Sequence, residues 1–382
     1  MGPNGSGFAG GDTDLLLSPE RPNHRRRLSP ASAAEVIGPA LAALAAVWVI
    51  FSIAGLSAPV GLVVSWFLTF LLFYGLLCWR QYGVLAMKQR LATVTIYACA
   101  LIALAALVAL IVEVADKGLS VALADFPHFF YADMTGLTAT APVTAVGVGP
   151  AIVGTVEQVG LAVLFTLPIG VMTAMYLVES RGSFSRLVSA VVDAMTGSPA
   201  IIAGLFVYLF WVAPHHTTGK TGFAAAMALG VMMLPITTRA SQEVIAVVPG
   251  SLREAALALG APEWRVALRV VLPTARSGLA NAIILAIARV TGETAPILFD
   301  VGGNNRYNWN PFSGQQDNLA FRFYQLIFQP GVNANRDAWG TGLVLMLVVF
   351  VLFVFARIAG ASSPGRRRLR LPFRNMMRSN PS

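Results

Sequence analysis

Two charged residues, Arg289 and Glu293, lie four positions apart within residues 277–299, a segment that is otherwise strongly apolar. Residues at that spacing face the same side of a helix. An arginine guanidinium stays charged at physiological pH, and its planar fork matches two oxygens of a phosphate-like anion. A neighbouring carboxylate can orient the fork, accept a proton carried by the anion, or weaken binding enough for release. We therefore expect the pair to take part in the translocation of an oxyanion.

The depth of the pair within its segment favours this interpretation. Arg289 lies about twelve residues into a helix over 277–299, which is roughly 18 Å along its axis and near the centre of a bilayer. Charged side chains at that depth are costly, and they are normally functional. The alternative is a plain salt bridge that tethers helices.

Other polar residues in apolar segments are weaker candidates. Arg239 closes the segment 222–240, where an anion contact and an anchor at the membrane interface explain it equally well. Glu157 and Gln158 lie near the outer end of a second segment, where we expect hydrogen bonding within the protein. Asp193 is near the start of a third segment, where the helix dipole would stabilise it.

No pattern in the sequence predicts catalysis. It lacks the Gly-x-x-x-x-Gly-Lys-Ser/Thr loop that binds ATP phosphates. No Ser-His-Asp set or metal-ligand spacing stands out, and Cys78 and Cys99 both fall in apolar segments. We therefore predict no catalytic residue, metal or cofactor, and we expect a partner chain to supply the energy.

The elements that position these residues must be membrane helices. Hydrophobic residues make up 56% of the 382, charged residues make up 12%, and the mean hydropathy is +0.68. Soluble domains carry about 25% charged residues, whereas a helix across a hydrocarbon core about 30 Å thick needs some twenty apolar residues. We predict an all-α polytopic membrane protein whose spanning helices cover residues 36–56, 60–78, 92–114, 150–178, 190–212, 222–240, 277–299 and 339–360.

The distribution of lysine and arginine predicts the orientation. With a cytoplasmic N-terminus, 21 of these residues fall on the cytoplasmic side and 5 on the other side. Because cytoplasmic loops are enriched in positive charge, we expect both termini and the loop 241–276 to be cytoplasmic. The net charge of +9 is therefore explained by orientation in the membrane, and it does not indicate binding of nucleic acid.

The loop 241–276 has the pattern of two short helices joined by a sharp turn. Pro249 and Gly250 break the preceding helix, and the residues that follow are good helix formers. Gly260 suits a left-handed cap at the end of the first short helix. An alternative role for Glu254 is a capping box, in which Ser251 would be the N-cap residue.

The same loop could transmit movement from a partner protein. The small side chains of Ala255 and Ala256 allow a partner surface to approach closely, and Gly260 fixes the angle between the two short helices. Pro273 disfavours further helix at about Leu272. The alternative is an ordinary amphipathic hairpin at the membrane interface.

The loop resembles the cytoplasmic loop of the permease subunits of bacterial binding-protein-dependent ABC importers. It has Glu-Ala-Ala, three residues, Gly, nine residues, an aliphatic residue, one residue and Leu-Pro, over residues 254–273. The resemblance implies that an ATPase engages this loop through Glu254, Ala255, Ala256 and Gly260.

The flanking sequence resembles the A-type permeases of the phosphate-specific branch of that family. The residues that carry the resemblance are the Ala-Arg-x-x-Gly-Glu-Thr-Ala-Pro stretch at 288–296, Gly154-Thr155, Pro168-Ile169-Gly170, Tyr176-Leu177-Val178-Glu179, Ser198-Pro199 and Gly204-Leu205-Phe206. The similarity spans roughly residues 92–360 and implies a six-helix core of the type I importer fold, with a phosphate path near Arg289. The first 91 residues depart from the family pattern.

The resemblance also implies the organisation of the chain and its partners. We expect a disordered cytoplasmic tail over 1–35, an extra pair of transmembrane helices over 36–91, the permease domain over 92–360 and a basic cytoplasmic tail over 361–382. The implied partners are a second, C-type permease, two ATP-binding subunits and an extracytoplasmic phosphate-binding protein, in a bacterial plasma membrane.

Two other functions remain open at this point. A permease for sulfate or molybdate would also use an arginine-based site, although a dianion that carries no proton has less use for Glu293. An autonomous channel, secondary transporter or membrane scaffold is the other alternative. Such a protein would have no use for a loop shaped to engage an ATPase.

Overall fold

The computed structural model describes four stretches of the chain, residues 30–55, 58–135, 147–180 and 182–361. Within them the fold is all-α, as predicted, and the one pairing of strand type is an isolated bridge between Gly302 and Gln316. Most of the two predicted tails, 1–35 and 361–382, falls outside the described residues.

The first compact unit, residues 1–108, is built around a row of aromatic side chains. Trp66, Phe70 and Tyr74 follow one another at four-residue spacing, with ring centroids 6.4 Å and 5.7 Å apart. The indole of Trp66 donates to the carbonyl of Ala40 at 3.0 Å, which joins two helices. These helices are α1 and the first part of α2, whose full bounds are Pro30–Ala54 and Pro59–Ala124.

The range α2 comprises two helices that meet at a kink, in agreement with the prediction of two helices at 60–78 and 92–114. The kink lies at Gly83, where φ is 81°. Arg90 lies after the kink and donates to Glu35 of α1 at 2.8 Å. The residues between the two predicted ranges are helical on both sides of Gly83 and do not form a longer loop.

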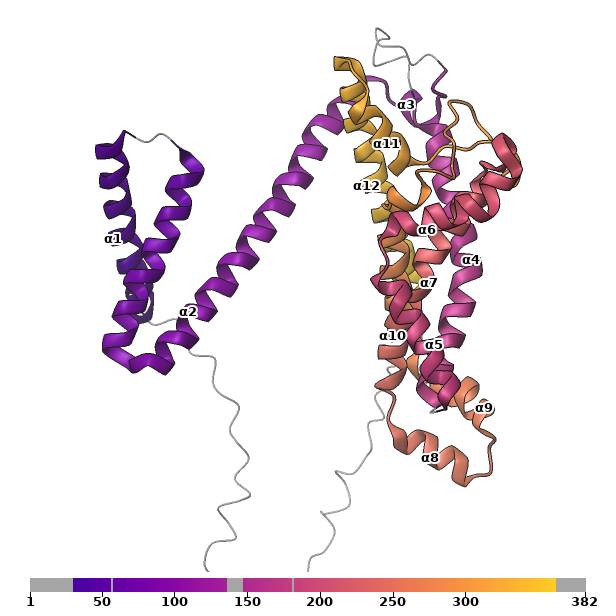
Figure 1. The fold of residues 1–382 in the computed structure, drawn as a ribbon, viewed down its shortest axis with the longest axis horizontal. Helices are drawn as coiled ribbons and strands as arrows, with labels where there is room; N and C mark the ends of the chain where they lie inside the picture. Colours follow the sequence, from indigo (N-terminus) through magenta and orange to yellow (C-terminus); the bar gives the residue numbers. More distant parts are fainter. Residues whose placement is uncertain (1–29, 56–57, 136–146, 181, 362–382) are drawn as a thin grey trace, which may run out of the picture. The chain divides into compact units, whose positions relative to one another are not determined.

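The second compact unit, residues 109–382, begins within α2. Helices α4, α7 and α10 run side by side, with α8 and α9 at one end and α3 and α11 at the other (Figure 1). Helix α12 packs against α10 and α11. The helix bounds are α3 His128–Tyr131, α4 Gly149–Glu179, α5 Ser183–Gly197, α6 Ala200–Val207, α7 Gly222–Ala246, α8 Gly250–Ala258, α9 Glu263–Val266, α10 Leu272–Thr291, α11 Leu319–Phe328 and α12 Val332–Ala361.

Apolar side chains, three alanines among them, form the core between α4, α7, α10 and the residues that follow α10. Helices that cannot gain from the hydrophobic effect inside a membrane associate by close packing, which small residues permit. The buried cluster consists of Val159, Ala162, Ala225, Leu229, Met233, Ala286, Val290, Ile297, Val301 and Phe321. This packing brings the end of α10 against the middle of α7.

Six helices among the described residues are long and apolar enough to cross a membrane, or seven when one bent pair counts as a span. The bent pair corresponds to the predicted helix 190–212. Its axis turns by 105° between α5 and the segment that begins with α6. Ser198 is extended there (φ −78°, ψ 139°), as expected of a residue that precedes a proline, Pro199. Helix α2 counts once among the six despite its break.

Several predicted helix ends are displaced in the structure, and the starts of α5, α10 and α12 are among them. Helix α7 continues to Ala246, whereas the sequence predicted its end at residue 240. Helix α10 ends at Thr291, whereas the prediction extended it to residue 299. The helix is capped by Gly292, which has non-helical angles (φ −91°, ψ 0°), and Pro296 lies in a short 3-10 turn that follows.

The prediction that Pro273 disfavours helix at Leu272 is wrong. Residues 263–291 form one continuous helical span. The five residues before Leu272, Ala267–Val271, adopt a π-helical turn, a wider winding that accommodates the proline ring and its missing N–H.

Candidate functional site

Arg289 and Glu293 both line a cavity of about 590 Å³ in the second unit. The cavity lies where α5 gives way to α6, and its opposite wall is the middle of α7 around Pro235. The other lining residues are mostly apolar: Met195, Thr196, Ser198, Ala200, Ile202, Ala203, Phe206, Val231, Met232 and Ile236. The charged pair therefore lies at the C-terminal end of α10 and faces a mostly apolar cavity beside the middle of α7.

The ion pair itself is loose. Arg289 Nε and Glu293 Oε1 are 3.9 Å apart, and the Arg289 side chain is 63% exposed. Glu293 lies just beyond the end of α10, and its N–H donates to the carbonyl of Val290 at 3.1 Å. A guanidinium with so few protein contacts keeps most of its donors available for a ligand. The site is therefore arranged to bind an anion without being neutralised in advance.

A close approach of two backbones places the broken helix beside this pair. A side chain at Gly204 of α6 would put its Cβ 2.1 Å from the carbonyl oxygen of Pro296, three residues after Glu293. Only glycine permits that contact. The first turn of α6 begins at Ala200 on the cavity wall, and backbone N–H groups at a helix start lack helical partners and favour negative charge.

The structure does not bring Arg239 into this cavity. Its guanidinium donates to Ser189 Oγ at 3.0 Å, to Gln242 Oε1 at 2.6 Å and to the carboxylate of Asp193. Asp193 lies in the second half of α5, so its predicted stabilisation by a helix start is wrong. The arginine–carboxylate contact joins α7 to α5 and accounts for both residues.

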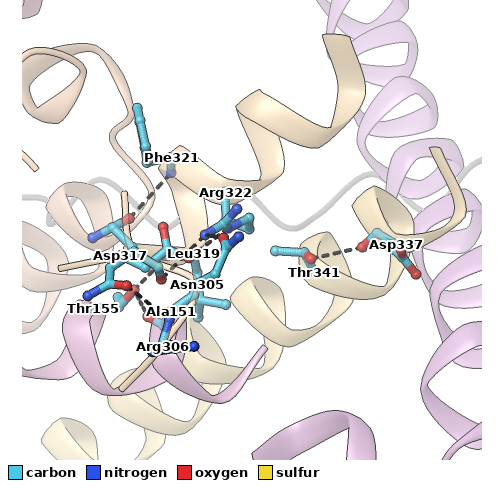
Figure 2. A network of polar contacts seen from close by, with 12 residues as sticks. Ala151, Thr155, Asn305, Arg306, Asp317, Leu319, Phe321, Arg322, Asp337 and Thr341 are labelled. Atoms are coloured by element: carbon cyan, nitrogen blue, oxygen red, sulfur yellow. Dashed lines mark hydrogen bonds and ion pairs between the residues drawn. The ribbon is translucent and has the colours of Figure 1, made fainter. Parts of the chain in front are cut away.

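A polar network that sequence reasoning missed holds the segment after α10 in place (Figure 2). Arg322, only 6% exposed, donates to the buried Asp317 at 2.7 Å and to Asn305 at 2.8 Å. The hydroxyl of Thr155 on α4 accepts from the N–H of Leu319 at 2.8 Å. These contacts attach the start of α11 to α4, and the high density of asparagine, glutamine and aspartate was the signal for them.

Glu157 and Gln158 belong to the same network, as the sequence analysis expected. Gln158 donates to the carbonyl of Asp317 at 2.9 Å and accepts from Asn318 at 2.9 Å. Glu157 accepts from Gln316 at 2.6 Å. Both side chains bond within the protein, between α4 and the residues before α11.

The loop 241–276, which we call the coupling loop, has the predicted sharp turn, or elbow, between its two short helices. Gly260 has φ 79°, its N–H donates to the carbonyl of Leu257 at 2.9 Å, and the N–H of Ala261 donates to Ala256 at 3.2 Å. This pair of bonds is the glycine cap that ends many helices. Glu254 and Ala255 are exposed and Ala256 is half-buried, so the face that bears them is open to a partner.

The capping-box alternative for Glu254 is wrong. The residue that precedes α8 is Pro249, and no side chain caps the helix. Ser251 lies inside the helix, so it cannot act as the N-cap residue. The exposed Glu254 carboxylate therefore has no role in starting α8.

Residues 166–368 match the family described as binding-protein-dependent transport system inner membrane component. The chain belongs to this family. The matched region contains the cavity, the break between α5 and α6, and the coupling loop. The whole of the first unit lies outside it, consistent with the departure of the first 91 residues from the family pattern.

This chain is similar in sequence to several known proteins. It is 40% identical over 228 residues, 59% of this chain and 73% of the relative, to "Phosphate transport system permease protein PstA 1" of Mycobacterium tuberculosis. It is 31% identical over 274 residues, 71% of this chain and 93% of the relative, to "Probable phosphate transport system permease protein PstA" of Methanocaldococcus jannaschii. Among solved structures, an inward-facing MetNI methionine ABC transporter chain is 22% identical, with a TM-score of 0.41 over 56% of this chain and 91% of that one.

One ion pair of this permease-family chain ties its coupling loop to the membrane helices. Arg253 of α8 donates through Nε to Glu179 at the end of α4, at 3.0 Å. The same guanidinium donates to the carbonyls of Val248 and Ile245, at 3.1 Å and 3.2 Å. Arg253 therefore connects α8 with α4 and with the end of α7. The sequence contained Glu179 in a motif but gave no sign of its partner.

Proposed function

We propose that this chain is the A-type permease subunit of an ATP-driven importer that moves inorganic phosphate into a bacterial cell. The loosely paired Arg289, on a mostly apolar cavity at the end of α10 and beside the middle of α7, is the main observation that supports this proposal. The names of the relatives indicate phosphate as the substrate. The chain provides the path and carries out no ATP hydrolysis of its own.

Arg289 and Glu293 have complementary tasks in this proposal. The guanidinium fork and the first turn of α6 hold two oxygens of the phosphate, and the apolar walls strengthen that attraction by excluding water. Glu293 limits the affinity by like-charge repulsion, and it can accept the proton of monohydrogen phosphate. Binding is then strong enough to admit the ion and weak enough to release it, which transport requires.

The coupling loop converts movement of the ATPase into movement of the path. An ATPase subunit bound to the α8 face that carries Glu254 and Ala255 would push on α8, and Arg253 would pass that displacement to Glu179 of α4. The continuous helical span 263–291 links the loop to Arg289 at its far end. The complex comprises this chain, a C-type permease, two ATP-binding subunits and an extracytoplasmic phosphate-binding protein. Both termini of this chain lie in the cytoplasm.

The test is phosphate uptake in cells that lack their own A-type permease and express this chain or its Arg289→Ala variant. We expect the wild-type chain to restore uptake and Arg289→Ala to reduce it by at least about tenfold, since a charge-assisted contact contributes about 1.5–3 kcal/mol. Arg276→Ala removes the same charge from an exposed position on the same helix and is the matched control. It should transport normally.

Each outcome bears on a different part of the proposal. Normal uptake by an assembled Arg289→Ala complex would show that Arg289 is a structural tether. If the wild-type complex assembles and restores no phosphate uptake, the substrate assignment fails. Sulfate and molybdate uptake would then be measured in the same cells.

A further inference from the structure

A second pocket, of about 320 Å³ and with a mostly polar lining, lies at the end of α4 where the chain turns into α5. It is distinct from the cavity of Arg289, and the two share no lining residue among those the structure describes. Its polar lining consists of Ser180, Gly182, Ser185, Arg186, Ser189 and Gln242. The described lining therefore combines one cation with hydroxyl and amide groups and includes no carboxylate.

The charge of Arg186 is not neutralised within the described residues. Its one hydrogen bond there is donated to Ser183 Oγ at 3.3 Å. The carboxylates nearby on the bordering helices are engaged elsewhere, because Asp193 pairs with Arg239 and Glu179 pairs with Arg253. Glu243 follows Gln242 on α7 but does not line the pocket. The pocket consequently carries net positive charge.

The hydroxyl of Ser185 provides an independent indication of a ligand. Ser185 is only 7% exposed and lines the pocket, yet its side chain makes no hydrogen bond to any described residue. An unpartnered hydroxyl on the wall of a pocket is free to donate to a ligand. Nothing caps the start of α5 with a side chain, so backbone N–H groups of its first turn are also available.

Gln242 is oriented by its neighbour so that it can donate. Its Oε1 accepts from Arg239 at 2.6 Å, which directs the carbonyl end of the amide toward that guanidinium. The amide nitrogen remains as a donor on the pocket wall. The pocket thus presents the Arg186 guanidinium, the Ser185 hydroxyl, the Gln242 amide and the start of α5. All of these can donate to a tetrahedral oxyanion.

We propose that this pocket binds an oxyanion of the phosphate class, at the end of the second unit that carries α8 of the coupling loop. Ser180 directly follows Glu179, which pairs with Arg253 of α8. An ion in the pocket therefore lies beside the connection between α4 and the coupling loop. The assignment of phosphate rests on the proposed function, and the same chemistry would accept the phosphate headgroup of an anionic lipid.

The test measures binding of radiolabelled inorganic phosphate to the assembled complex in nanodiscs that contain only phosphatidylcholine. All variants carry Arg289→Ala, so that phosphate bound in the Arg289 cavity does not contribute to the signal. We expect saturable binding that Arg186→Gln weakens by about tenfold or more and Ser185→Ala weakens by severalfold, as for lost bonds to a charged ligand. Arg357→Gln, which removes an exposed charge from α12, is the control and should change nothing.

A second set of nanodiscs distinguishes the two sources of the oxyanion. Anionic phosphatidylglycerol is added, and the lipid retained by the complex is measured by native mass spectrometry. Retained lipid that Arg186→Gln releases, without binding of free phosphate, assigns the pocket to a headgroup and supports the oxyanion site. Binding of either ligand that is insensitive to Arg186→Gln, or no binding of either, overturns the proposal. Loss of binding in Arg186→Gln, together with no phosphate uptake by an assembled wild-type complex, would leave this site standing while the proposed function fails.

Discussion

At the scale of single residues, the number of protein contacts separates arginines that otherwise look alike. Arg322 is buried and bonded to Asp317 and Asn305, and Arg239 is committed to three side chains. Arg289 has a single contact at 3.9 Å, and Arg186 has no carboxylate partner among the described residues. Of these four, only the last two retain most of their donors for a ligand, which is why each is assigned to an anion site.

Asp300 is a second informative residue, because it is fully buried and neither carboxylate oxygen has a hydrogen-bond partner among the described residues. Burial raises the pKa of this carboxyl from 3.8 to about 8, and the positive charge of Lys220 opposes the rise only in part. Asp300 is therefore protonated at neutral pH, since an isolated buried carboxylate is far less stable than the neutral acid.

This raised pKa predicts how stability depends on pH. The unfolded chain loses the Asp300 proton near its ordinary pKa, whereas the folded chain keeps the proton up to about pH 8. The contribution to stability is thus complete below about pH 4 and is lost progressively up to pH 8. The thermal midpoint of the detergent-solubilised wild type, minus that of Asp300→Asn, should fall between pH 5 and 8. Parallel pH profiles for the two proteins would contradict the raised pKa.

At the scale of elements, interruptions of helices create the functional surfaces. The 105° bend between α5 and α6 opens the wall of the Arg289 cavity. The glycine cap at Gly260 sets the angle between the two short helices of the coupling loop. At the bend, the interruption directs the start of α6 toward the cavity, which an unbroken helix could not do.

The elbow of the coupling loop can be tested with two matched glycines. A Cβ added at Gly260 or at Gly250 would meet no atom within 4 Å, but of the two only Gly260 has positive φ, at 79°. Alanine at Gly260 should strain the loop by about 1 kcal/mol or more and reduce phosphate uptake per ATP hydrolysed by the complex. Gly250→Ala should leave that ratio unchanged. Equal behaviour of the two variants would show that the elbow angle does not matter for coupling.

At the scale of the whole molecule, the coupling loop and the polar network around Asp317 lie at opposite ends of the second unit (Figure 1). The excess of positive charge on one side predicts that the coupling loop faces the cytoplasm. The network near α11 would then face the outside, where it would be available to a binding protein.

Cysteine labelling tests this orientation. Ser251 of α8 and Ser313 before α11 are both exposed, and replacing either by cysteine changes one atom. In a chain whose Cys78 and Cys99 are replaced by alanine, a membrane-impermeant maleimide should label Ser313→Cys in intact spheroplasts. It should label Ser251→Cys only after the membrane is permeabilised. The reverse pattern would invert the proposed topology.

The sequence by itself determined the all-α class, the approximate helices, the coupling-loop elbow and the charged pair Arg289 and Glu293. These features depend on local properties: apolar length, glycine and proline conformations, and spacing along one helix. Only the tertiary structure decided that Arg239 bonds to Asp193, that Arg253 bonds to Glu179, and that Arg186 and Gln242 share a pocket. Such contacts join residues far apart in the sequence or on neighbouring elements, and packing of α4, α5, α7 and α8 brings them together. The displaced helix ends have the same origin, because local propensity sets where a helix can end and tertiary contacts set where it does.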